Sequence, residues 1–198
     1  MHNRKFPTVH YLPTIIESGS VYVDKTQFVV KLLENTAKPS FFLSRPRRFG
    51  KSMFVSTLEE VFLGKKDLFK GLYIYDKIDW TDTYPVIRFS LDKIQFASLG
   101  LETALSKAVH GAAKGYDITL EETNSGLAFR ELLKKLSQKH QKKVVVLVDE
   151  YDKPIIHYLE NDNTEQAETN RDILKAFYGV LKDSGQFQIG RASCRERV

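Results

Sequence analysis

The stretch that decides the fold is Ser40-Phe-Phe-Leu-Ser-Arg-Pro-Arg-Arg-Phe-Gly-Lys-Ser52. Its first five residues are apolar or small, and they predict a short buried strand. An arginine-rich loop follows, and residues 51–62 then read as a helix that ends near Gly64. Strand, loop, Gly-Lys-Ser and helix, in this order, are the context that a phosphate-binding P-loop needs.

The residue types of this loop suit a nucleotide and its metal ion. Gly50 lets the backbone come close to a phosphate, whose oxygens can accept from the N–H groups at the helix start. Lys51 would neutralise the β- and γ-phosphates, and the Ser52 hydroxyl would complete the shell of Mg²⁺. We expect Arg47, Arg48 and Phe49 to belong to the same nucleotide-binding loop.

One position departs from the general pattern G-x-x-x-x-G-K-[ST], because Arg45 stands where the first glycine is usual. That glycine normally serves a sharp turn, so a loop stiffened by Pro46 must turn differently. The arginines could instead contact a nucleic-acid backbone. Their place beside Lys51 favours the phosphates of a nucleotide.

A second motif lies about 100 residues further on, in Lys142-Lys-Val-Val-Val-Leu-Val-Asp-Glu150. It reads as a strand buried on both faces that ends in two acids, as a Walker B segment does. Asp149 could hold Mg²⁺, and Glu150 could orient and deprotonate the attacking water, which favours hydrolysis over kinase chemistry. The plain alternative is a buried strand followed by two solvated acids. Together with the Gly-Lys-Ser loop, the pair indicates an NTP hydrolase.

The rest of the chain alternates between the two kinds of element, which predicts a mainly parallel α/β sheet. We expect β structure at 21–23 and 84–91, and helices at 25–34, 98–114, 125–140 and 170–182. Asp24 should cap the first of these helices, Pro154 should lie in the first turn of a short one, and 160–168 should be a loop. Asp24 and Lys25 are expected to pair structurally, and the alternative is a site near the base of the nucleotide. Trp80 and the segment 73–75 are expected to pack in the core.

Composition and charge exclude several classes of protein. The 198 residues are 42% apolar with a net charge of +5, which is ordinary for a globular domain. Nine basic and three acidic residues in 1–52 place the positive charge near the loop. No apolar run reaches the roughly 18–20 residues of a membrane span, and no secretory signal is visible, so we expect a cytoplasmic protein. The lone Cys194 and five scattered histidines exclude a disulfide framework and predict no Cys- or His-based metal site.

The last ten residues, Ile-Gly-Arg-Ala-Ser-Cys-Arg-Glu-Arg-Val, differ in character from what precedes them. They show neither helical nor strand periodicity. They also resemble, residue for residue, a translation of common sequencing-adapter DNA. We therefore expect 1–188 to be one P-loop domain that is incomplete at its C-terminal end, and 189–198 to be a non-native tail.

The two motifs, together with Leu12-Pro13, Tyr22-Val-Asp-Lys25, Tyr84-Pro-Val-Ile87 and Val148-Asp-Glu-Tyr-Asp-Lys-Pro154, resemble the predicted AAA-ATPase-like family of bacteria and archaea. In that family the arginine-rich loop is usual. The resemblance implies an ASCE-type P-loop NTPase that uses ATP and Mg²⁺. It also implies, in many members, a downstream domain similar to PD-(D/E)XK nucleases, through which nucleic acid would be a partner. Asp152 belongs to the last block, where a loop-organising carboxylate or a helix cap is the expected role.

The resemblance also shows what is absent from the sequence. Such folds carry a further central strand with a γ-phosphate sensor and then a helical lid, and neither is recognisable after Gln188. We therefore expect a sheet without one inner strand, with exposed edges, poor solubility and little activity. The predicted function is ATP binding with Mg-dependent hydrolysis when the domain is intact. The alternatives are a nucleotide-dependent switch or nucleic-acid-associated module without turnover, and a kinase-like phosphotransferase. The sequence leaves oligomerisation open.

Overall fold

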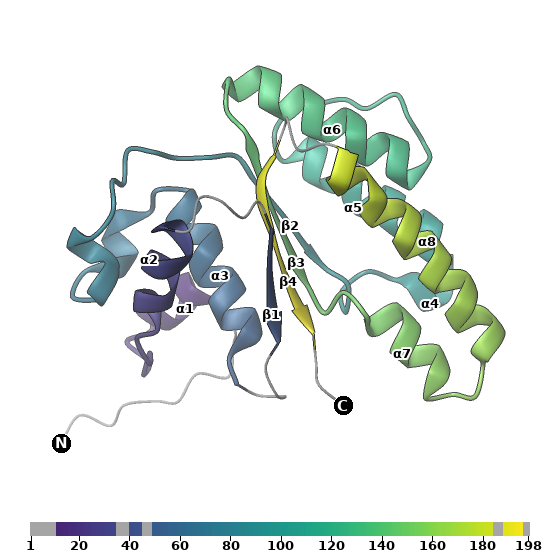
Figure 1. Cartoon of the computed structure of the whole chain (residues 1–198), viewed down its shortest axis with the longest axis horizontal. Coiled ribbons are helices and arrows are strands. Elements are labelled where there is room, and N and C mark those ends of the chain that lie inside the picture. Colours follow the sequence, from purple (N-terminus) through teal and green to yellow (C-terminus); the bar gives the residue numbers. More distant parts are fainter. Residues whose placement is uncertain (1–10, 35–39, 45–48, 184–187, 196–198) are drawn as a thin grey trace.

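A parallel sheet forms the centre of the molecule, in a computed structural model that describes residues 11–34, 40–44, 49–183 and 188–195. The strands are β1 (Ser40–Ser44), β2 (Val86–Ser90), β3 (Val144–Asp149) and β4 (Gln188–Arg195). They lie in the order β1-β4-β3-β2, and each neighbouring pair is parallel (Figure 1). All carboxyl ends therefore meet at one edge of the sheet, and the prediction of a parallel α/β fold is confirmed.

Helices cover both faces of the sheet, which gives three layers (Figure 1). One face carries α1 (Leu12–Glu17), α2 (Thr26–Glu34), α3 (Lys51–Phe62) and the 3₁₀ turns η1 (Lys66–Phe69) and η2 (Tyr73–Asp76). The other carries α4 (Phe96–Leu99), α5 (Leu101–Lys114), α6 (Ser125–His140), α7 (Lys153–Leu159) and α8 (Thr164–Asp183). Parallel sheets need this double cover because their strands are apolar on both faces.

Strand β3 joins two separate cores because its side chains alternate between the faces. Val145 and Leu147 pack with Val55 and Leu58 of α3. Val144, Val146 and Val148 pack into the opposite core with α5, α6 and α8. All six residues of β3 are buried. Burial of one such side chain contributes about 1.5–3 kcal/mol, so the strand anchors both layers.

Several predicted elements have different limits in the structure. The helix expected at 98–114 is two helices, because Gly100 adopts φ 76° and ψ 149°, a backbone conformation that only glycine takes readily. The loop expected at 160–168 is shorter, since α8 already begins at Thr164, where the Asn163 side chain accepts from the Gln166 N–H at 3.1 Å. Residues 21–23 form no strand, and α1, η1 and η2 were not predicted.

The expectation of a sheet without an inner strand is wrong for this structure. Strand β4 lies between β1 and β3, with Arg191 opposite both Ser40 and Val146. Residues 188–195 show neither the apolar run of β3 nor a regular alternation, so the sequence pattern does not indicate this strand. Its ladder is made by backbone N–H and C=O groups, which every non-proline residue carries.

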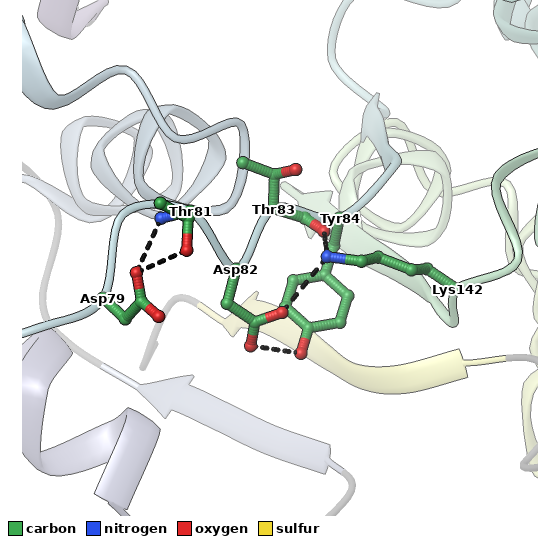
Figure 2. A network of polar contacts seen from close by, with 6 residues as sticks. All are labelled: Asp79, Thr81, Asp82, Thr83, Tyr84 and Lys142. Carbon is green, nitrogen blue, oxygen red and sulfur yellow. Dashed lines mark hydrogen bonds and ion pairs between the residues drawn. The ribbon is translucent and has the colours of Figure 1, made fainter.

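The amino ends of β2 and β3 are joined by a polar network (Figure 2). Lys142 Nζ lies 3.2 Å from Asp82 Oδ1, donates to the Thr83 carbonyl at 2.7 Å and sits 5.0 Å from the ring centroid of Tyr84. The Tyr84 hydroxyl donates to Asp82 Oδ2 at 2.6 Å, and this hydrogen bond, with burial, raises the pKa of Tyr84 to about 12. Nearby, Asp79 accepts from the N–H and hydroxyl of Thr81. Each of these polar groups has a protein partner.

Candidate functional site

The turn that starts α3 contains a glycine in a backbone conformation that other residues rarely adopt. Gly50 lies in the left-handed region, at φ 76° and ψ 30°, and its carbonyl accepts from Phe54 N at 3.0 Å. Within the described residues, no side chain caps this N-terminus. The first N–H groups of a helix have no partner in the helix itself, so those around Lys51 and Ser52 are suited to an anion.

The two predicted nucleotide ligands that begin α3 differ in burial. Lys51 is only 5% exposed and its Nζ is buried, whereas Ser52 is half-buried. Phe49, just before the turn, is 57% exposed. An ammonium is costly to bury, so a lysine at the first position of a helix that starts in a turn is not explained by packing alone. Arg45, Arg47 and Arg48 lie outside the described residues.

Asp149 ends β3 at the carboxyl edge of the sheet and is 2% exposed. Side chains alternate along a strand, so Asp149 lies on the same face as Val145 and Leu147, which α3 covers. Its Oδ2 lies 3.9 Å from Arg88 Nη2. Among the residues that the structure describes, no donor reaches its other oxygen, Oδ1, although that atom is buried. A buried carboxylate oxygen without a donor is rare, and it suits a group that receives a ligand.

Arg88 was not predicted as part of this site. It lies in the middle of β2 and donates to Glu59 Oε2 of α3 at 2.8 Å, while its other nitrogen faces Asp149. The guanidinium therefore bridges two carboxylates that are far apart in the sequence. The signal in the sequence was that Arg88 is the single charged residue of this strand and lies on the same face as Val86 and Ser90.

A second acid of α3, Glu60, lies beside Glu59 and is 4% exposed. Burial raises the pKa of Glu60, although a hydrogen bond from Tyr11 acts in the opposite direction. Burial and the neighbouring Glu60 carboxylate also raise the pKa of Tyr11. The two neighbouring acids of α3 thus have different partners, since Glu59 pairs with Arg88 of β2 and Glu60 with Tyr11 before α1.

Glu150 follows directly after the strand and takes a left-handed backbone conformation, with φ 52°. It is half-buried, and its carbonyl accepts from Lys153 N at 3.1 Å, which forms the turn into α7. This conformation is uncommon for a residue other than Gly, Asn or Asp, and such positions gather at functional sites. Asp152 precedes α7 at the N-cap position, but its side chain makes no capping hydrogen bond, so the structure does not bear out the helix-cap role.

The expected pairing of Asp24 with Lys25 is wrong. Asp24 accepts from the N–H and hydroxyl of Thr26 and from Tyr73 N, at 2.7–2.8 Å. Lys25 instead donates to the Phe49 carbonyl at 3.5 Å. The expected packing is confirmed for Trp80, whose ring lies 4.9 Å from that of Phe69, and for Ile74, whereas Tyr73 is largely exposed.

Membrane-spanning helices and acid, histidine or cysteine clusters that could hold a metal ion are both absent from the described part of the chain. No helix there is both long and apolar enough to cross a membrane. No cluster of three or more His, Cys, Asp or Glu side chains there could enclose a metal ion. A metal ion at Asp149 would therefore take most of its ligands from hydroxyl groups, water or a bound anion.

Comparisons with known proteins identify the family. A family model described as "Predicted AAA-ATPase" matches residues 8–192. A protein of Azotobacter chroococcum mcd 1, described as "Uncharacterized protein in vnfD 5'region", is 40% identical over 164 residues, which cover 82% of this chain and 31% of that protein. The chain thus spans less than a third of this relative's length. No solved structure gives a significant match. With nearly its whole length matched, the chain belongs to the family of predicted AAA-ATPases.

Proposed function

We propose that this domain is a P-loop NTPase domain that binds ATP with Mg²⁺ at the carboxyl edge of its sheet and, when complete, hydrolyses it. The observation that carries the proposal is Asp149, a buried carboxylate at the end of β3 whose Oδ1 meets no donor among the described residues. Ligands of parallel α/β sheets bind outside the carboxyl ends of the strands, where this oxygen lies.

The start of α3 would hold the phosphate chain. Gly50 gives the turn its left-handed conformation, and the N–H groups that follow would donate to phosphate oxygens. Lys51 would supply the positive charge that balances the β- and γ-phosphates. Arg47, Arg48 and Phe49 would complete the loop around the nucleotide.

The available residues fit Mg²⁺. Mg²⁺ keeps several waters and takes one or two protein oxygens besides the phosphates, so it needs no protein cage of three acids. Asp149 Oδ1 and the Ser52 hydroxyl would supply those oxygens. When bound, the ion would neutralise negative charge on the phosphates as the bond to the leaving group breaks.

Glu150 would act on the water that attacks the γ-phosphate. Its left-handed backbone turns the chain directly after Asp149, so the two neighbouring acids need not follow the strand's alternation. A carboxylate here would accept a hydrogen bond from the water and take its proton. This role favours hydrolysis over a switch without turnover.

The proposal is tested by calorimetric titration of MgATP into the chain and into the Lys51→Ala variant. We expect the variant to lose binding. Lys70→Ala, which removes an exposed lysine after η1, should bind as the parent does. Circular dichroism should show that both variants are folded. Unchanged ATP binding by Lys51→Ala would exclude the P-loop assignment.

Turnover is tested separately, with Glu150→Gln and the control Glu160→Gln at the exposed end of α7. In a version of the protein that hydrolyses ATP, Glu150→Gln should keep binding and lose phosphate release, whereas Glu160→Gln should retain both. If the parent binds ATP and a complete version releases no phosphate, the switch alternative is correct.

A further inference from the structure

A second lysine lies against the turn that starts α3. Lys25 precedes α2, 24 residues before Phe49, yet its Nζ donates to the Phe49 carbonyl at 3.5 Å. A methyl group built on Gly50 would lie 3.8 Å from the same nitrogen. The ammonium is therefore in van der Waals range of the left-handed turn, from a segment outside the arginine-rich loop.

The backbone on either side of Lys25 is held by neighbouring residues. Asp24 accepts from Thr26 N and from Tyr73 N, and the Thr26 hydroxyl accepts from Ile74 N at 3.1 Å. Burial alone would raise the pKa of Asp24, but the hydrogen bonds from Tyr73 and Thr26 outweigh it and lower the pKa. Asp24 and Thr26 thus hold the start of α2 against η2. This sets the position of the Lys25 backbone between them.

The local chemistry does not explain a lysine at this place. An ammonium has three donors, and a 3.5 Å contact with an uncharged carbonyl is a weak use of one of them. No carboxylate among the described residues forms an ion pair with Lys25. Lys51 follows Gly50 directly in the sequence, so two lysines come from different segments to this helix start. Positive charges concentrated around a helix start attract a polyanion.

We propose that Lys25 is a second phosphate-binding lysine, which donates to the phosphate chain of the nucleotide held at the turn. The inference rests on the proposed function and adds a contact from outside the P-loop. In the alternative, Lys25 only supports the loop through the Phe49 carbonyl. A structural lysine would affect thermal stability, whereas a phosphate ligand would affect affinity for anions.

The test is calorimetric titration of MgATP and of inorganic tripolyphosphate into the parent chain and three variants. Lys25→Met should lower the affinity for both ligands about tenfold and leave the melting temperature unchanged. Lys25→Arg, which keeps the charge, should recover part of the affinity. The matched control is Lys31→Met, which removes an exposed lysine of α2 whose ammonium lies 6.0 Å from the Phe28 ring. This control should bind as the parent does.

The outcomes separate this inference from the proposed function. If the parent binds ATP and Lys51→Ala does not, while Lys25→Met binds as the parent does, the role of Lys25 alone is overturned. Equal weakening by Lys25→Met and Lys31→Met would also overturn it, because that result reflects distant charge. If the parent binds neither ATP nor tripolyphosphate, both the proposed function and this inference are overturned.

A second measurement does not depend on any variant. The parent chain is labelled with an amine-reactive reagent, with and without MgATP, and the modified lysines are located by mass spectrometry. Labelling of Lys25 should slow several-fold with MgATP, while labelling of Lys31 should not change. Equal labelling of Lys25 under both conditions, at saturating ATP, would contradict the contact.

Discussion

The two edges of the sheet are built in opposite ways. At the amino edge, Asp82, Tyr84 and Lys142 each have a protein partner, and the network joins β2 to β3 (Figure 2). At the carboxyl edge, Asp149 is buried with one oxygen that no described residue reaches, and Gly50 and Glu150 both have left-handed backbones. At the amino edge the polar groups pair with one another, whereas at the carboxyl edge one buried oxygen of Asp149 meets no donor among the described residues.

The largest effect should come from removing β4, the strand that lies between β1 and β3. Without β4, the facing backbone groups of β1 and β3 lose their ladders, and β1 loses its neighbour in the sheet. The loss should exceed the roughly 5–15 kcal/mol that stabilises a domain of this size. We expect a chain of residues 1–187 to be insoluble or to unfold without cooperativity.

Differential scanning fluorimetry of the soluble fraction, beside the full chain, measures this loss. An equal melting temperature for the two chains would show that β4 contributes nothing to the sheet.

Substitutions at single residues should separate function from stability. Asp149→Asn keeps the shape of the side chain but removes the charge offered to a metal ion. We expect a fall in turnover on the order of 100-fold in a version that hydrolyses ATP, with a stability change within about 1 kcal/mol. The amino-edge counterpart is Lys142→Met, which breaks an exposed ion pair, should cost about 0.5–1 kcal/mol and should leave turnover unchanged.

Phosphate release measures the turnover of both variants, and urea denaturation measures their stability. The comparison of the edges is wrong if Lys142→Met impairs turnover as much as Asp149→Asn does.

We expect Arg88 to stabilise the fold, as the amino-edge groups do, although it lies next to the candidate site. Arg88→Met leaves Asp149 and Glu59 without their shared cation, and we expect a cost of about 2–3 kcal/mol. Arg171→Met, which removes two exposed ion pairs from α8, should cost less than about 1 kcal/mol. Chemical denaturation measures both. Similar small losses would mean that Arg88 is no counter-charge for Asp149.

The smallest effect should appear only at high pH. The pKa of Tyr84 is raised from 10.0 to about 12, so between these values the folded state keeps a proton that the unfolded state has lost. Stability should therefore fall as the pH rises through this window. The Tyr84→Phe variant should show a shallower fall, since it has no such proton. Urea denaturation at several pH values measures the difference, and parallel curves would exclude this role for the hydrogen bond to Asp82.

Local signals account for the elements that the sequence predicts well. The limits predicted for β1, α3 and α6 agree with the structure, because each has its own start or stop, such as Gly50 before α3. Asn124 caps α6 by accepting from Gly126 N and Leu127 N. Such residues act within a few positions of themselves, so no knowledge of the rest of the chain is needed.

The failed predictions depend on residues distant in the sequence. The β-rich segment 21–23 forms no strand because propensity does not supply a neighbouring strand to pair with. The bridge from Arg88 to Glu59 and Asp149 exists only once β2, β3 and α3 are packed together. Lys25 likewise reaches Phe49 only through the fold. The roles of Lys51, Ser52, Asp149 and Glu150 toward a nucleotide stay predictions.

The origin of the last ten residues has a direct test, which is long-read sequencing of the source DNA across the codon for Gln188. An adapter origin predicts that the reads will show other codons there in place of those for Ile-Gly-Arg-Ala-Ser-Cys-Arg-Glu-Arg-Val. If the DNA encodes these ten residues, the adapter interpretation is wrong.

The order of the strands also has a consequence for synthesis on the ribosome. Strand β1 is made early, yet its neighbour in the sheet is β4, where Ser40 lies opposite Arg191. Until residues 188–195 have left the exit tunnel, β1 cannot join the sheet, while β2 and β3 can already pair. Pairings so distant in sequence form slowly and leave strand edges exposed meanwhile. The nascent chain should therefore keep β1 unpaired, and should bind chaperones until β4 is released.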